Sequence, residues 1–223
     1  MLKVYYLRVT DFADYSEGFL KVHVSEETRQ AVNSFRSEKP KRTRLLGEFM
    51  VRSLLQSEWG LKNENYQILR GEHGKPFVSG ASVSAFFNLS HSGDYIVCAL
   101  SEKEVGIDIE RVGRFRPEVA GRFFHPGEVR VLENLPEDRQ ADAFFRYWSA
   151  KESFLKYTGT GLSASLSGFE VCFGEQVRIR KGNLYEPVSV RECYLDKDYK
   201  CFVCYAEPEV PGIFSFKKLS QTK

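Results

Sequence analysis

The order of the expected helices and strands places this chain in the α+β class, in two halves of similar content. Helical and strand texture each occur twice along the 223 residues, without the regular strand and helix alternation of a doubly wound sheet. Short segments of the first half also have weak counterparts in the second. We expect the division near residue 103, giving domains 1–103 and 104–223.

The internal similarity rests on two pairs of segments. DYIVCALSE (94–102) resembles DYKCFVCYAEPE (198–209) once a residue or two is inserted, and GEFMVR resembles KESFLK with Glu48 above Glu152. A duplicated unit would leave such pairs. Chance similarity would produce either match as well, so both explanations stay open at this point.

The first half is expected to begin with a strand and to become helical. Residues 2–9 have strand texture, and SEETRQAVNSF begins with Ser25, a typical N-cap residue. Apolar residues recur at roughly helical spacing over 42–59 and predict a long amphipathic helix that stops at Gly60. GEHGKPFVSG then reads as turns, and SVSAFF and DYIVCAL read as strands.

The second half begins with EVGIDIERV (104–112). Its odd positions from 105 to 109 are Val, Ile and Ile, whereas its even positions from 104 to 110 are Glu, Gly, Asp and Glu. This alternation predicts a strand with one buried and one solvated face, which puts Asp108 and Glu110 on the same side. Gly106 is expected to leave room beside them for a ligand. Helices over PGEVRVLENL and ADAFFRYWSAKESFLKYTG and a few short strands complete the chain.

Composition excludes several functional classes. The 32 Lys and Arg against 30 Asp and Glu give a net charge of +2, which offers no electrostatic argument for nucleic acid as the main partner. No run approaches ~18 apolar residues, so we expect no membrane partner. The odd number of cysteines suits a reducing cytoplasm, and Cys201 and Cys204 are expected as buried strand residues instead of a metal or redox pair.

Two acidic motifs together have the groups of a metal site. Asp108 and Glu110 on one strand face lie roughly 6.5 to 7 Å apart at the backbone, and a third carboxylate with phosphate oxygens would complete a Mg²⁺ site. WSAKESFLK supplies Glu152, with Lys156 four residues further on the same helical face. Taken alone, the first motif is more often a solvated face and the second a surface ion pair. Their combination favours the metal interpretation.

Groups suited to phosphate occur in three further stretches. NLSHSG is expected to place Asn88, Ser90 and His91 in a tight turn, and GKP holds Lys75 between two residues that restrict the backbone. KPKRTRLLGE brings Arg44 and other basic residues to a helix N-terminus. Each stretch alone is also typical of ordinary turns or solvated surface. Together with the acids they indicate phosphoryl-type chemistry on a nucleotide-like ligand.

GKP, NLSHSG, VGIDIE and WSAKESFLKYTGTGL, in this order and at these separations, closely resemble the 4′-phosphopantetheinyl transferases of the long, surfactin-synthetase-activating type. The resemblance covers at least residues 42–166. It implies the fold of that family, in which two similar α+β halves related by a pseudo-two-fold enclose the cofactor in a monomer. It also implies transfer of the 4′-phosphopantetheine of coenzyme A to a serine of an apo acyl or peptidyl carrier protein, with release of adenosine 3′,5′-bisphosphate, for fatty acid, polyketide or nonribosomal peptide synthases.

The resemblance implies roles for the second half's motif residues. Asp108, Glu110 and Glu152 match the Mg²⁺ ligands, and Mn²⁺ accepts the same oxygens. Glu152 also matches the general base for the carrier serine, and Lys156 matches the lysine that contacts the diphosphate. A phosphohydrolase or nucleotidyl transferase, and a binding module without activity, are the alternatives that these residues leave.

Residues of the first half match coenzyme A contacts. Ser90 and His91, with Asn88 in the same motif, match the turn that holds the 3′-phosphate, and Lys75 matches a phosphate or adenine contact. Arg44 occupies a position where family members vary, and we expect it to face the 3′-phosphate.

The resemblance also implies that the carrier docks between the two acidic motifs, on GRFFHPGEVRVLENL. Phe124, Val129 and Leu132 are predicted as exposed apolar residues for a carrier helix, and ordinary helix packing is the alternative. Arg122 and Arg130 would attract an acidic carrier.

Overall fold

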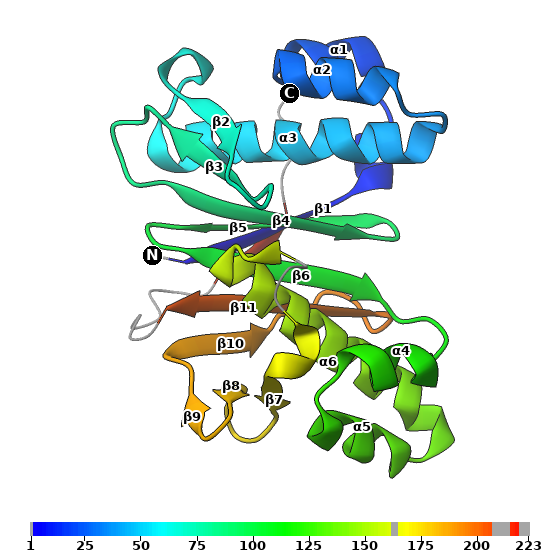
Figure 1. Ribbon diagram of the computed structural model, residues 1–223. Helices are drawn as coiled ribbons and strands as arrows, with labels where there is room; N and C mark the ends of the chain where they lie inside the picture. Colours follow the sequence, from blue (N-terminus) through cyan, green and yellow to red (C-terminus); the bar gives the residue numbers. More distant parts are fainter. Residues whose placement is uncertain (1, 162–164, 207–214, 219–223) are drawn as a thin grey trace.

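The computed structural model describes residues 2–161, 165–206 and 215–218. Helices lie on the two outer sides of two main sheets (Figure 1). The α-helices are α1 (Glu17–Val22), α2 (Glu26–Asn33), α3 (Glu38–Trp59), α4 (Pro117–Phe123), α5 (Pro126–Glu133) and α6 (Glu137–Thr158). The strands are β1 (Lys3–Arg8), β2 (Gln67–Arg70), β3 (Pro76–Ser79), β4 (Phe86–Ser92), β5 (Tyr95–Ser101), β6 (Val105–Arg111), β7 (Glu170–Cys172), β8 (Arg178–Lys181), β9 (Leu184–Tyr185), β10 (Val188–Glu192), β11 (Tyr199–Ala206) and β12 (Ser215–Lys218).

The two main sheets repeat one connectivity. In the first, β5 lies between β1 and β4 and is antiparallel to both; in the second, β11 lies in the same way between β6 and β10. The similar sequence segments 94–102 and 198–209 fall largely on the two central strands, β5 and β11. A long helix belongs to each sheet, α3 to the first and α6 to the second. The α+β class in two halves is therefore confirmed, and the topology supports duplication over chance.

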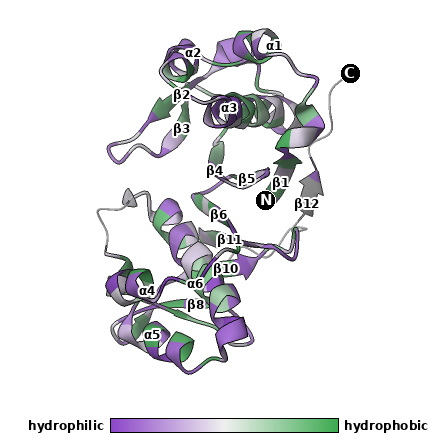
Figure 2. Cartoon of the chain, turned by 90° about the vertical axis from the view of Figure 1, so that its right-hand side faces the viewer, coloured by the Kyte–Doolittle hydropathy of each residue, from purple (hydrophilic) through white to green (hydrophobic). Residues whose placement is uncertain are grey.

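Three apolar cores hold these layers together. One lies between α1–α3 and the first sheet, and a second lies between the helices of the other half and the second sheet. The third lies between the two sheets and joins Val4 and Val97 of the first to Ile107 and Val203 of the second, all fully buried. Burial of one such side chain contributes roughly 1.5 to 3 kcal/mol, so the inter-sheet core ties the halves into one body. Figure 2 shows the two sheets next to each other between the helices of the two halves.

Several local signals are confirmed. Ser25 caps α2, its Oγ accepting a hydrogen bond from the Thr28 N–H at 3.2 Å. Helix α3 ends at Gly60, whose positive φ of 66° is accessible to glycine without strain. That helix begins at Glu38, four residues before the expected start at Arg42. Cys201 and Cys204 are buried in β11, as expected.

The expected solvated face of β6 is wrong. Val105, Ile107 and Ile109 do fill the inter-sheet core, but α6 covers the other face, and Asp108 is only 3% exposed. Gly106 does not leave room for a ligand either. A Cβ there would clash with the Ser153 carbonyl oxygen and the Tyr157 backbone nitrogen, because α6 crosses the strand at backbone contact.

The expected tight turn at NLSHSG is also different. Residues 86–92 form strand β4, and the reversal is confined to Gly93 and Asp94. Asn, Ser and Gly favour turns locally, but pairing with β5 along the whole segment imposes the extended conformation. Among the helices that the structure describes, none is both long and apolar enough to cross a membrane.

Candidate functional site

Side chains of β4 join the two halves. Strands β4 and β6 lie side by side but belong to different sheets. Asn88 Oδ1 accepts a hydrogen bond from the Ile107 N–H at 2.9 Å, and Ser92 Oγ accepts one from the Arg111 N–H at 3.0 Å. Between them, Ser90 Oγ donates to Asp108 Oδ1 at 2.9 Å. Side chains at the even positions of β4 thus make the hydrogen bonds to β6 that backbone groups make between neighbouring strands of one sheet.

Asp108 is the centre of the acidic group. Its Oδ1 accepts from Lys156 Nζ at 2.6 Å as well as from Ser90, and Ser149 of α6 donates to its backbone carbonyl at 3.0 Å. Its Oδ2 is buried and has no hydrogen-bond partner among the residues that the structure describes. A buried carboxylate oxygen without a partner is costly, so this atom is suited to a cation.

Glu110 and Glu152 lie in the same electrostatic environment. Burial raises the pKa of Glu110 to about 7, with a further contribution from the charge of Asp108, and Ser92 Oγ donates to its carboxylate at 3.1 Å. Burial raises the pKa of Glu152 as well, again assisted by Asp108. Both shifts indicate carboxylates that a cation would stabilise in the ionised form.

The donor set therefore fits Mg²⁺, which prefers hard oxygen ligands and keeps several sites for water or phosphate. In the present side-chain positions, however, no three His, Cys, Asp or Glu residues of the described chain are arranged closely enough to hold an ion. Instead, the ammonium of Lys156 forms an ion pair with Asp108. The fit thus rests on the oxygen chemistry and on the unpartnered Oδ2 of Asp108.

A buried ion pair fixes the helix that bears Glu152 and Lys156. Lys151 Nζ donates to Glu128 Oε1 at 2.8 Å and to the Phe169 carbonyl at 2.7 Å, and neither charged side chain is exposed. Glu128 also accepts from the Val171 N–H at 2.7 Å. Sequence reasoning missed this pair, because a Lys beside a motif Glu carries no sign that it faces inward.

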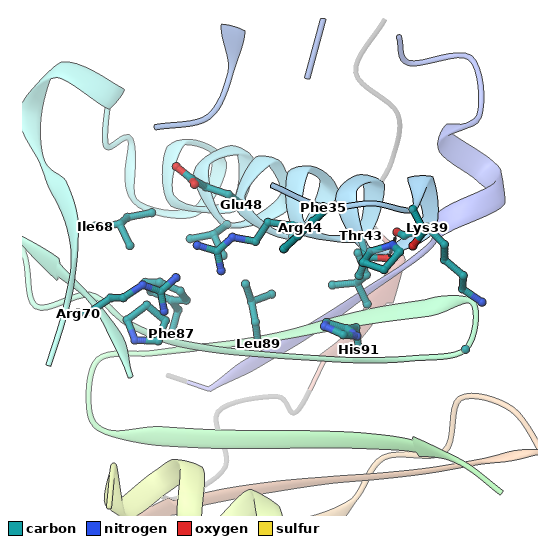
Figure 3. Close-up of a pocket in the computed structure, with 17 residues that line it drawn as sticks. Phe35, Lys39, Thr43, Arg44, Glu48, Ile68, Arg70, Phe87, Leu89 and His91 are labelled. Carbon is teal, nitrogen blue, oxygen red and sulfur yellow. Dashed lines mark hydrogen bonds between the residues drawn. The ribbon is translucent and has the colours of Figure 1, made fainter. Parts of the chain in front are cut away.

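The opposite face of β4 lines a cavity of about 820 Å³ between α3, β2 and β4 (Figure 3). Phe87, Leu89 and His91 lie along its β4 side. The guanidinium groups of Arg44 from α3 and Arg70 from β2 extend into it. The odd residues of β4 thus face a basic and apolar cavity, whereas the even residues face the acids.

The charge of this cavity is suited to an anion. Arg44 Nε is buried and unpartnered within residues 2–161, 165–206 and 215–218, and burial and then the charge of Arg70 lower the Arg44 pKa. Arg70 Nε donates to Glu27 at 3.0 Å at the exposed side. Glu48 also lines the cavity, but its carboxylate accepts from Arg52 Nε at 2.7 Å. A phosphate would supply the missing acceptor.

The predicted residues thus divide into separate groups. One group consists of the three acids, Asp108, Glu110 and Glu152, together with Lys156 and Ser90. Arg44 and an exposed His91 lie at the cavity on the other face of β4.

Two further predicted residues, Asn88 of NLSHSG and Lys75 of GKP, contact other parts of the chain. Asn88 is 4% exposed with Oδ1 occupied by β6, and Lys75 reaches the second half. Sequence reasoning missed Arg70: its charge beside GEHGKP was visible, but nothing local indicated that it faces Arg44.

The prediction that three apolar residues are exposed for carrier docking is wrong for two of them. Phe124 and Leu132 are 2% and 0% exposed, because the short helix α5 and the residues before it pack on α6. Phe124 stacks on Phe144, at 5.2 Å between ring centroids. Val129 is partly buried, whereas Arg122 and Arg130 are exposed, so their proposed attraction of a carrier stays a prediction.

Comparison with known proteins gave matches over nearly the whole chain. A family model described as the 4′-phosphopantetheinyl transferase superfamily matches residues 104–204, and one described as 4′-phosphopantetheinyl transferase, N-terminal, matches residues 16–103. The 4′-phosphopantetheinyl transferase gsp of Aneurinibacillus migulanus is 35% identical over 206 residues, 92% of this chain and 86% of that protein. The 4′-phosphopantetheinyl transferase Sfp of Bacillus subtilis (strain 168) is 35% identical over 190 residues, 84% of each. The crystal structure of Thermotoga maritima holo-[acyl-carrier-protein] synthase gives a TM-score of 0.40 at 21% identity, over 48% of this chain and 64% of that one.

Proposed function

This chain belongs to the 4′-phosphopantetheinyl transferase superfamily, and we propose that it transfers the 4′-phosphopantetheine group of coenzyme A to a serine of apo carrier proteins. The observation that carries the proposal is the unpartnered, buried Oδ2 of Asp108 among the acids, with Lys156 beside it. The basic cavity lies across one strand from these groups. Such an arrangement suits a substrate with a diphosphate and a separate phosphate monoester.

In this proposal the metal is held by Asp108, Glu110 and Glu152. Mg²⁺, or Mn²⁺ with the same oxygen ligands, would supply positive charge that offsets the negative charge of the diphosphate while the P–O bond within it breaks. Lys156, whose ammonium is hydrogen-bonded to Asp108 and Ser90 in this structure, would donate to the diphosphate.

Glu152 is proposed as the base. The carrier serine oxygen forms a bond to the phosphorus that bears pantetheine, and the P–O bond of the diphosphate breaks. The electron pair leaves with adenosine 3′,5′-bisphosphate, and the hydroxyl proton passes to Glu152. Burial raises the pKa of this carboxyl and a bound cation would lower it again, so Glu152 would be ionised and able to accept the proton directly or through water.

The first half is proposed to bind the nucleotide part of coenzyme A. Arg44, Arg70 and His91 would hold the 3′-phosphate in the cavity. Ser90 would reach the substrate through Lys156, to which its Oγ is bonded at 2.9 Å. Asn88 and Lys75 stay predictions as coenzyme A contacts.

The test is the gain of one phosphopantetheine mass by an apo carrier incubated with the protein, coenzyme A and Mg²⁺. No gain with any carrier would contradict the proposal, and turnover of coenzyme A without a carrier would favour a phosphohydrolase. Chelation of the metal should abolish the gain, and added Mg²⁺ should restore it.

The proposal also describes a monomeric, cytoplasmic enzyme with halves 1–103 and 104–223. Its carriers would belong to fatty acid, polyketide or nonribosomal peptide synthases. Assays of kcat/KM on apo carriers of each kind would identify the preferred class, and sedimentation would give the oligomeric state.

A further inference from the structure

Lys75 extends from the first half into the second. It lies in the turn between β2 and β3, and its ammonium donates to Glu104 Oε2 at 2.6 Å, to the Val105 carbonyl at 3.2 Å and to the Tyr157 carbonyl at 3.1 Å. A lysine ammonium has three donors and no acceptor, so these three partners use all of them. In this arrangement no donor of Lys75 is left for a phosphate.

The three partners belong to the two elements that bear the acids. Val105 is the first residue of β6, three before Asp108, and Tyr157 directly follows Lys156 in the last turn of α6. The last four carbonyls of a helix have no partner inside it, and a cation there also interacts favourably with the helix dipole. Lys75 therefore stabilises the end of α6 and links it to the start of β6.

Close packing supports this link. A Cβ at Gly159, the left-handed residue that ends α6, would lie 3.4 Å from Lys75 Cδ. A Cβ at Gly161 would lie 3.6 Å from His73 Cβ, in the same turn as Lys75. The β2–β3 turn thus lies against the end of α6.

An ordinary surface ion pair would explain only part of this contact. The Glu104 side chain is 52% exposed, and exposed pairs contribute roughly 0 to 1 kcal/mol. The two backbone carbonyls are different, because they are fixed parts of β6 and α6, and the Lys75 side chain is only 19% exposed. The carbonyl bonds are therefore the important ones.

We propose that Lys75 is a positioning residue: it holds the end of α6 against the start of β6, so that Lys156 meets Asp108, and it acts on the transfer step without contacting coenzyme A. This inference rests on the proposed function. It competes with the family-based expectation that Lys75 contacts a phosphate or the adenine, and the two make opposite predictions about which kinetic constant changes.

The decisive variant is Lys75→Met, which keeps the aliphatic stem and removes all three donors. Lys62→Met, an exposed lysine of the same half, is the matched control. We expect Lys75→Met to lower kcat at least tenfold while the coenzyme A Kd, measured by calorimetry, changes less than threefold. Lys62→Met should change neither, and Glu104→Gln should lower kcat less than threefold.

Hydrogen exchange supplies a readout that needs no substrate. In the free protein, Lys75→Met should increase amide exchange at residues 155–159 at least tenfold, with unchanged exchange in α3. If the wild type fails to modify any carrier, the proposed function fails, but this measurement still tests the link to α6.

Two results would overturn the inference. One is a coenzyme A Kd weakened tenfold or more, whatever happens to kcat, because that is the effect of a lost ligand contact. The other is exchange at 155–159 equal to that of Lys62→Met. If Lys75→Met does not fold, Lys75→Gln, which retains an amide donor group, replaces it with the same criteria and smaller expected changes.

Discussion

The two long helices carry similar acid and base pairs that have different surroundings. In α3, Glu48 accepts from Arg52 Nε at 2.7 Å and from both the N–H and the hydroxyl of Ser25, at 2.7 and 3.0 Å. In α6, Lys156, four residues after Glu152, is bonded to Asp108 of β6 instead. The difference lies in the strands. In the repeated connectivity β1 is the counterpart of β6, but β1 reads KVYYLR and has no carboxylate, whereas β6 has two. A duplicated helix thus gains chemistry from the strand beside it.

Removal of one carboxylate from each helix tests this contrast most strongly. Glu152→Gln should lower kcat about 10² to 10⁴-fold, the usual contribution of general acid–base catalysis, with the coenzyme A Kd within roughly tenfold, or about 1.4 kcal/mol. Glu48→Gln should instead lower the free energy of unfolding by about 1 to 3 kcal/mol, because it removes the charge from a hydrogen-bonded group. Carrier modification and urea unfolding measure the two effects, and equal losses of kcat would contradict the comparison.

The buried pair of the second half should dominate stability. Lys151→Met leaves Glu128 buried and unpaired, which typically costs about 3 to 5 kcal/mol and should lower the Tm accordingly. The double variant with Glu128→Gln should recover part of that loss, because no unpaired charge remains. Calorimetry of both proteins checks this, and a double variant less stable than Lys151→Met alone would refute the explanation.

The cavity of the first half should distinguish coenzyme A from an analogue that lacks the 3′-phosphate. Arg44→Ala should lower kcat/KM for coenzyme A about 10 to 100-fold, since a hydrogen bond to a charged group contributes about 1.5 to 3 kcal/mol. It should have little effect with 3′-dephospho-coenzyme A as substrate. Arg70→Ala should act in the same way. Arg139→Ala, which removes an exposed arginine of α6 outside the cavity, is the control. An equal loss with both substrates would exclude a role in 3′-phosphate recognition.

Two glycines give the smallest contrast. Gly106→Ala should destabilise the protein by about 1 to 3 kcal/mol, because its Cβ would enter the backbone of α6. Gly47→Ala should change stability by less than about 1 kcal/mol, since a Cβ there would meet Leu89 Cδ1 at an ordinary 3.8 Å and Ala favours a helix. Urea unfolding of both variants measures the difference, and the reverse order would contradict the packing described.

The sequence predicted what depends on local periodicity. The alternation around Asp108 gave strand β6, and apolar spacing with Gly60 gave most of helix α3. Long-range packing accounts for the failures: α6 covers the face of β6 that looked solvated, and pairing with β5 keeps Ser90 and His91 extended on opposite faces. Arg70 was missed because its partner in the cavity, Arg44, lies on a distant element.

The alternation along β4 has a consequence for insertions and deletions. Because side-chain direction in a strand has a period of two residues, a slip of one position sends every side chain to the other face. A single residue gained or lost just before Phe86, if the strand shifted with it, would turn His91 toward the acids and Ser90 toward the arginines, with no substitution in either motif. The register of β4 against β5 is therefore as constrained as the identity of the residues in the strand.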